Sequence, residues 1–142
     1  KNFQLTILGL AKERDRLTVV DDQWGAPTPA DLIARVIAAA IPQALVDPGK
    51  LGVYHLAAAG ETSWYGLAQF LVAEALAAGA KLKITPDAIA PIAGADYPAK
   101  ARRPANSRLD TTKLRTAFGL TLPPWQDGIR QLITTLRSEG RV

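Results

Sequence analysis

The 142-residue chain contains no cysteine and no methionine, and its single histidine is His55. The absence of cysteine excludes disulfide bonds, thiolate metal sites and cysteine nucleophiles. One histidine excludes histidine-rich zinc sites and the HExxH motif. The apolar stretch from Ile33 to Ile41 is too short to span a bilayer, and no secretory signal opens the chain. We therefore expect no membrane association.

The excess of charge of one sign is also small, because 17 basic and 13 acidic residues leave a net charge of +4. This mild excess permits an anionic ligand but is equally typical of an ordinary solvated surface. No aromatic residues alternate with a basic tract, so we expect no nucleic-acid partner. The composition is that of one globular domain, and the lack of cysteine fits a reducing, cytoplasmic location. Because the chain begins at Lys1 and has no methionine, we expect a processed or truncated product.

Hydrophobic periodicity predicts an alternation of helices and strands. Thr28 is the expected N-cap of the second helix, with Asp31 completing a capping box, and Pro42 is expected to kink or end that helix. Helices are expected over residues 2–12, 29–41, 64–78, 111–118 and 124–136, and strands over 17–20, 52–57 and part of 84–92.

Strands that are separated by helices predict parallel pairing through crossover connections. Two strands and a fraction of a third are too few for a complete sheet, however, and such apolar helix faces need a wider sheet or a partner surface. The pattern therefore predicts the second half of an α/β fold.

Several catalytic motifs are missing. None of the 11 glycines forms a GxGxxG dinucleotide loop or a P-loop. No tyrosine is followed by a lysine four residues later, a pair in which the lysine would lower the pKa of the phenol for proton transfer. No serine lies in a GxSxG motif. His55, in an apolar segment, is expected to fill the core or a strand and not to act as a base.

Two segments are candidates for ligand binding. Residues 21–28 follow a strand and precede a helix N-terminus, a place where α/β folds bind phosphates, although a well-capped connecting loop would look the same. Trp24 in this loop could stack on a base or sugar, or merely cover the loop. Residues 97–110 contain Arg102, Arg103 and Arg108, whose guanidinium groups could bind a diphosphate, and the alternative is a solvated basic loop.

A series of sequence blocks resembles the C-terminal half of the dTDP-4-dehydrorhamnose reductase family, which belongs to the extended short-chain dehydrogenase/reductases. The resemblance covers essentially the whole chain. The blocks that carry it are Asn2-Phe3, 11–14 (AKER), 19–28 (VVDDQWGAPT), 54–57 (YHLA), 60–64 (GETSW), 101–110 (ARRPANSRLD), 118–120 (FGL), Leu122-Pro123 and Trp125.

The resemblance implies an incomplete Rossmann-like α/β fold, namely the C-terminal substrate-binding half with few parallel strands and several helices. It implies that the whole enzyme reduces the 4-keto group of dTDP-6-deoxy-L-lyxo-4-hexulose to dTDP-L-rhamnose with NAD(P)H. The N-terminal half of the family carries the cofactor loop and the Tyr-x-x-x-Lys pair. This chain is therefore expected to bind the dTDP-sugar alone, with no cofactor, no metal and no hydride transfer of its own.

The resemblance also implies which residues bind the nucleotide-sugar. Arg103, which precedes a proline, is the first candidate for the diphosphate, and Trp24 stands where the family more often has phenylalanine. Asn106 and Ser107 are expected to shape the loop. The expected partners besides the dTDP-sugar are the N-terminal half, or a second copy that covers the apolar faces. The further candidate residues are Arg102, Asn2, Gln23, Trp24 and Thr28.

Two alternatives remain open. The chain could be a non-catalytic interaction module, since some relatives in this superfamily regulate another enzyme such as methionine adenosyltransferase. It could also be a fragment with no separate role. The Arg102-Arg103-Pro104 loop favours retained ligand binding over both alternatives.

Overall fold

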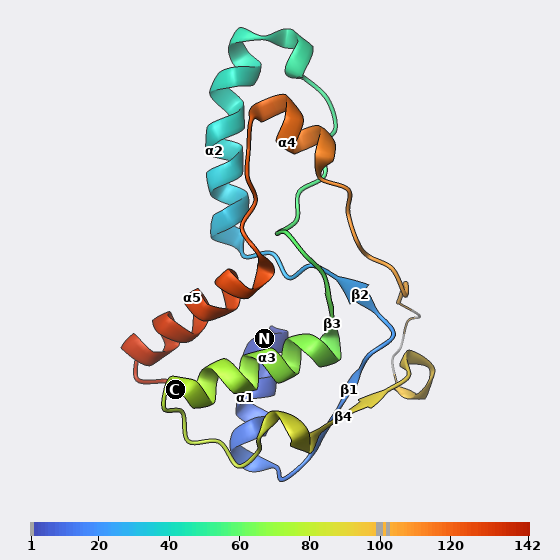
Figure 1. Cartoon of the computed structure of the whole chain (residues 1–142), viewed down its shortest axis with the longest axis vertical. Coiled ribbons are helices and arrows are strands. Elements are labelled where there is room, and N and C mark those ends of the chain that lie inside the picture. Colours follow the sequence, from blue (N-terminus) through green and yellow to red (C-terminus); the bar gives the residue numbers. More distant parts are fainter. Residues whose placement is uncertain (1, 99–100, 102) are drawn as a thin grey trace.

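The computed structural model describes residues 2–98, 101 and 103–142 (Figure 1). The helices of this part of the chain are α1 (Phe3–Glu13), α2 (Ala30–Val46), α3 (Trp64–Ala77), α4 (Thr112–Phe118) and α5 (Trp125–Ser138). Its strands are β1 (Leu17–Val20), β2 (Trp24–Gly25), β3 (Thr62–Ser63) and β4 (Ile89–Ile92), and three short 3-10 helices cover Pro48–Lys50, Pro86–Ala88 and Gly94–Asp96.

The strands form two separate pairs. β1 and β4 run parallel, with Leu17 opposite Ile89 and Val20 opposite Ile92. This pairing confirms the parallel arrangement expected from the helix–strand alternation. β2 and β3 pair antiparallel over two residues each. This second pair was not predicted, because two-residue strands carry no periodic signal.

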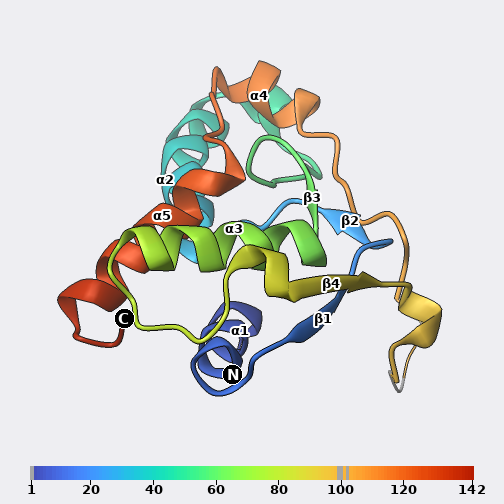
Figure 2. The same ribbon diagram turned by 60° about the horizontal axis from the view of Figure 1, so that its bottom comes forward.

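The hydrophobic core lies around α3, which packs against α1, α5 and the β1–β4 pair (Figure 2). The ring of Phe70 on α3 meets Trp125 at the start of α5 edge-on, with the centroids 5.1 Å apart. The buried positions follow the helical spacing that predicted these elements. They are Ile7, Leu8 and Ala11 on α1, Leu67, Ala68, Leu71, Val72 and Ala75 on α3, and Trp125, Ile129, Ile133 and Leu136 on α5.

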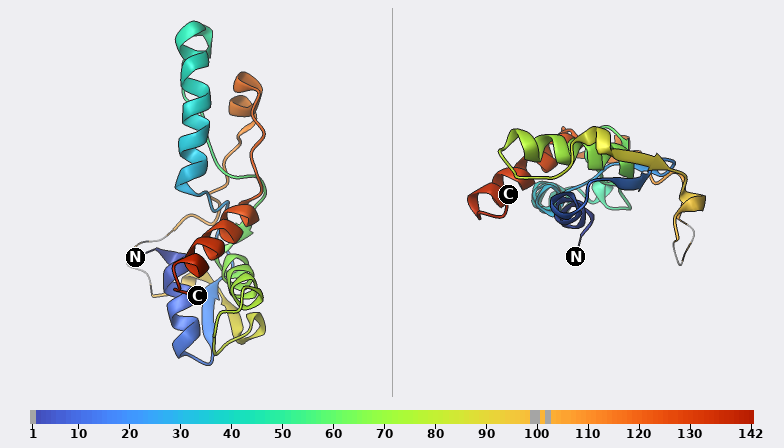
Figure 3. Two further views of the ribbon diagram at one scale, coloured as in Figure 1. Left: turned by 90° about the vertical axis from the view of Figure 1, so that its left-hand side faces the viewer. Right: turned by 90° about the horizontal axis from the view of Figure 1, so that it is seen from below.

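α2 and α4 lie at the end of the molecule that is far from α1 and the parallel strands (Figure 1). The left-hand view of Figure 3 shows α2 and α4 side by side at this end. Among the contacts at this end, the Tyr54 and Phe118 rings meet with their centroids 5.1 Å apart, and Gln43 Nε2 donates to the Phe118 carbonyl at 3.3 Å. Gly119, at a φ of 65°, ends α4 in the left-handed region, as expected for a glycine after a helix.

The expected strand over residues 52–57 is wrong. The described part of the chain offers these residues no neighbouring strand, so they pass through as an unpaired segment. His55 is exposed and does not fill the core, contrary to expectation. The apolar pattern of the segment therefore indicates a preference for strand conformation, but no strand in the described part of the chain pairs with it.

The expected boundaries of the second helix are also wrong. α2 begins after Pro29, not Thr28, so the Thr28–Asp31 capping box does not form. The helix continues through Pro42 to Val46. Pro42 removes one hydrogen bond to the carbonyl four residues earlier, at Ala38. Both residues are exposed, so water can replace that bond and the helix need not end.

We expect the pKa of Asp110 to lie below its usual value of 3.8. The Thr112 backbone N–H donates to its carboxylate at 2.8 Å, which stabilises the charged form, and the Thr112 side chain and Arg115 lower the pKa further. Because the pKa is depressed in the folded state, the resulting stabilisation is complete above the unfolded-state pKa. It is lost as the pH falls through the folded-state pKa.

A carboxyl NMR titration of the folded chain, with the urea-unfolded chain as the reference, measures this difference. A folded-state pKa equal to or above the unfolded-state value contradicts the hydrogen bond at the start of α4.

Candidate functional site

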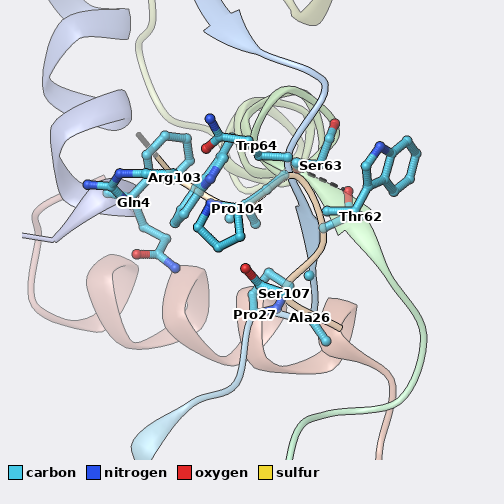
Figure 4. Close-up of a pocket in the computed structure, with 14 residues that line it drawn as sticks. Gln4, Ala26, Pro27, Thr62, Ser63, Trp64, Arg103, Pro104 and Ser107 are labelled. Atoms are coloured by element: carbon cyan, nitrogen blue, oxygen red, sulfur yellow. Dashed lines mark hydrogen bonds between the residues drawn. The ribbon is translucent and has the colours of Figure 1, made fainter. Parts of the chain in front are cut away.

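A cleft of about 550 Å³ opens where the starts of α1 and α3 meet β2 and the segment after residue 102 (Figure 4). It brings the two segments that the sequence analysis singled out onto one surface. The residues that line it are Phe3, Gln4, Gln23, Trp24, Gly25, Ala26, Pro27, Thr62, Ser63, Trp64, Leu67, Arg103, Pro104 and Ser107.

The backbone of Trp24 joins the walls of the cleft. Its N–H donates to the Ala105 carbonyl at 2.9 Å, and its carbonyl accepts from the Ser107 N–H at 2.8 Å. In the β2–β3 pair, Trp24 also stands opposite Ser63. The peptide groups of β2 therefore lie between the start of α3 and the 103–107 segment, and they fix both relative to each other.

The side chain of Ser63 stabilises the same wall through buried hydrogen bonds. This residue is only 3% exposed, and its Oγ donates to the Asp21 carboxylate while accepting from the Gly66 N–H at 3.0 Å. Asp22 is also engaged, because its carboxylate accepts from the Gly94 N–H at 2.9 Å. Both acidic side chains that follow β1 thus hold the scaffold, and neither lines the cleft.

Aromatic and small residues form the rest of the cleft. Phe3 and Trp64 pack against each other with their ring centroids 4.7 Å apart. In Figure 4, Arg103 and Gln4 lie on one side of Pro104, and Thr62 and Ser63 lie on the other. Trp64, the half-buried first residue of α3, also lines the cleft.

Arg103 is the one charged side chain among the described residues that line the cleft. No ion pair between described residues joins it to a carboxylate. Arg108, the other arginine of this loop in the described range, pairs with Glu61 at 2.8 Å and donates through its Nε to Asn106 Oδ1 at 2.9 Å. Arg108 therefore holds the loop and is not part of the cleft lining.

The remaining candidate residues divide into three groups. Gln23 and Trp24 line the cleft with Arg103. Asn2 and Thr28 lie outside the lining and have structural contacts: Asn2 Oδ1 accepts from the Leu5 N–H at 2.9 Å as the N-cap of α1, and Thr28 Oγ1 accepts from the Ala58 N–H at 3.0 Å. Arg102 lies outside the described residues.

The described residues show neither a metal-binding cluster nor a membrane-spanning helix. No group of three or more histidine, aspartate or glutamate side chains within this range is arranged to hold a metal ion. Likewise, none of the helices in the described ranges is both long and apolar enough to cross a membrane.

Comparison with known proteins identifies the family. The model of the RmlD substrate binding domain matches residues 1–138. The chain belongs to this family. This membership confirms the resemblance to the dTDP-4-dehydrorhamnose reductases that the sequence blocks indicated.

The RmlD substrate-binding domain of this chain has close relatives among curated proteins. It is 46% identical over 135 residues to the dTDP-4-dehydrorhamnose reductase of Escherichia coli K12. This match covers 95% of the chain but only 44% of that protein. It is 40% identical to the reductase of Burkholderia thailandensis, covering 98% of the chain and 48% of that protein. The chain thus spans less than half the length of these relatives.

Solved structures agree with this assignment. The dTDP-4-dehydrorhamnose reductase of Bacillus anthracis, solved in complex with NADP, superposes with a TM-score of 0.80 at 28% identity, covering 95% of this chain and 43% of that one. The corresponding reductase of Clostridium acetobutylicum gives a TM-score of 0.79 at 27% identity, covering 96% and 44%. The α/β arrangement with few parallel strands is therefore shared with these reductases.

The contacts of Thr28 generate a prediction that separates scaffolding from ligand binding. Thr28→Val removes the hydroxyl that donates to the Ala26 carbonyl and accepts from the buried Ala58 N–H. We expect the free energy of unfolding to fall by about 1–3 kcal/mol, because the Ala58 N–H loses its partner. Thr28→Ser keeps the hydroxyl and should retain most of the stability. Urea unfolding of both variants measures the difference, and equal midpoints for Thr28→Val and the parent would rule out this structural role.

Proposed function

We propose that the cleft binds the nucleoside diphosphate part of a dTDP-sugar, and that the chain is the C-terminal, substrate-binding half of a Rossmann-like dTDP-4-dehydrorhamnose reductase. The observation that carries the proposal is Arg103 in a cleft whose other described lining residues are uncharged. A guanidinium group donates two parallel hydrogen bonds to phosphate oxygens. No carboxylate in that lining competes with the anion for it.

The rest of the cleft suits the other parts of such a ligand. Its volume of about 550 Å³ lies within the range of roughly 300–1,000 Å³ that is typical of small-molecule sites. Trp24 and Trp64 offer flat apolar surfaces for a base or a sugar ring. Gln4, Gln23 and Ser107 supply donors and acceptors for hydroxyl and carbonyl groups.

In the reaction that we assign to the whole reductase, the cofactor NAD(P)H would supply the hydride for C4 of the 4-keto sugar, and the carbonyl oxygen would take up a proton. The residues of this chain do not fit the dinucleotide, because the connection from β1 to α2 contains a single glycine, Gly25, and no GxGxxG loop. They also include no Tyr-x-x-x-Lys pair to supply the proton. The role that we propose for this chain is therefore to bind and orient the nucleotide-sugar. The cytoplasmic location of the protein stays a prediction.

Binding of dTDP tests the proposal directly. We expect the chain to bind dTDP in isothermal titration calorimetry, and Arg103→Ala to weaken binding by about 10-fold or more, since charge-assisted hydrogen bonds to the phosphates are lost. Arg103→Lys should lose part of the affinity, because lysine keeps the charge without the planar fork. Thymidine, which has no phosphates, should bind the parent and Arg103→Ala alike.

Arg35→Ala is the matched control. It removes the same charge from an exposed site on α2, where Arg35 pairs with Asp31 and neither residue lines the cleft, and it should leave the affinity for dTDP unchanged. Absence of heat at millimolar dTDP, or equal affinities of the parent and Arg103→Ala, would overturn the proposal. Nucleotide-independent capture of a partner enzyme would then favour the regulatory-module alternative.

A further inference from the structure

Two hydrogen-bonded anchors hold the ends of the loop that residues 95–104 form. At one end, the Asp22 carboxylate accepts from the Gly94 N–H, with both oxygens 2.9 Å from the nitrogen. At the other end, the Trp24 N–H donates to the Ala105 carbonyl at 2.9 Å. Both ends of the loop are therefore fixed to the same short connection between β1 and β2. Loops whose two ends lie close together in this way are frequently functional.

The described residues of this loop have few attachments of their own. The Asp96 N–H donates to the Ala93 carbonyl and the Tyr97 N–H donates to the Gly94 carbonyl, which closes one short 3-10 turn. No backbone–backbone hydrogen bond joins the described residues of the loop to a distant part of the chain. Arg103 belongs to this loop, so its place in the cleft depends on where the two anchors hold the loop ends.

Close packing also sets the position of the first anchor. A Cβ atom at Gly94 would lie 2.7 Å from Gln23 Nε2 and 2.9 Å from Asp22 Oδ1, closer than real Cβ atoms come to other atoms. Glycine thus allows the start of the loop to lie directly against two side chains of the β1–β2 connection. One of these side chains, Gln23, lines the cleft.

We propose that Asp22 is a positioning residue for nucleotide-sugar binding, because its carboxylate holds the start of the loop so that Arg103 faces the cleft. The inference rests on the proposed function, in which Arg103 binds the phosphates. Asp22 does not line the cleft, so it acts through Gly94 and does not touch the ligand. A loop that is already fixed in its binding conformation lowers the entropic cost of binding.

This role predicts an effect opposite in sign to simple electrostatics. Removing a negative charge near an anion site should strengthen anion binding, or leave it unchanged where water and salt screen the charge. Removing the Asp22 carboxylate should instead weaken the binding of dTDP, because the start of the loop is released and Arg103 spends less time facing the cleft. The sign of the change therefore separates positioning from a charge effect.

Isothermal titration calorimetry with dTDP tests the proposal. We expect Asp22→Ala to weaken binding roughly fivefold. Asp22→Asn keeps one acceptor oxygen and should retain most of the affinity. Gly94→Ala should weaken binding to a similar extent as Asp22→Ala, because its Cβ displaces the Asp22 carboxylate, whereas the φ of Gly94 is not positive and is open to alanine. In the Arg103→Ala background, Asp22→Ala should change nothing, a coupling that a general loss of structure would not produce.

Asp96→Ala is the matched control. It removes the same charge from an exposed position in the 3-10 turn that begins at Gly94, where Asp96 forms no ion pair with a described residue, and it should leave dTDP binding unchanged or slightly stronger. Unchanged or tighter binding by Asp22→Ala, an equal loss with Asp96→Ala, or an equal loss in the Arg103→Ala background would overturn the inference. If Arg103→Ala alone weakens binding, the inference fails and the proposed function stands. If the parent chain does not bind dTDP, both fail.

Discussion

The architecture of the cleft depends on the peptide groups of a single residue, Trp24. Its N–H and carbonyl hold the 105–107 backbone on one side, and its pairing partner Ser63 starts α3 on the other. Ser63 in turn connects Asp21, at the end of β1, to the first turn of α3. A few hydrogen bonds thus bring together segments that are about 40 and about 80 residues apart in sequence. The position of Arg103 beside the cleft follows from this placement.

The electrostatics of the site follow from the same scaffold. Asp22 and Glu61 lie in sequence beside residues that line the cleft, and Asp21 follows β1 directly. Their carboxylates accept hydrogen bonds from the Gly94 N–H, from Arg108 and from Ser63 Oγ, respectively. None of the three carboxylates lines the cleft. Arg103 can then act on phosphate oxygens with little competition within the described lining.

Local signals in the sequence predicted most of the helices and the parallel strand pair. α1, α3 and α5 have apolar residues at helical spacing, and Gly119 ends α4 where a left-handed residue was needed.

Two kinds of feature escaped prediction. Trp64 joins the cleft because of where Phe3 lies, a long-range contact that spacing along one helix cannot reveal. Residues 52–57 have the pattern of a strand without a strand beside them, so local preference and tertiary context disagree. Of the candidate binding residues that the resemblance implied, Gln23, Trp24 and Arg103 line the cleft, whereas the capping and bracing contacts of Asn2 and Thr28 depend on atoms that only the folded chain brings near.

The way in which β2 is held has a consequence for how this family diversifies. The hydrogen bonds that hold this strand use main-chain atoms of Trp24, which every residue type except proline also offers. An exchange of the indole for a phenyl ring therefore keeps these bonds. Such an exchange is expected to change the surface of the cleft at small cost to folding.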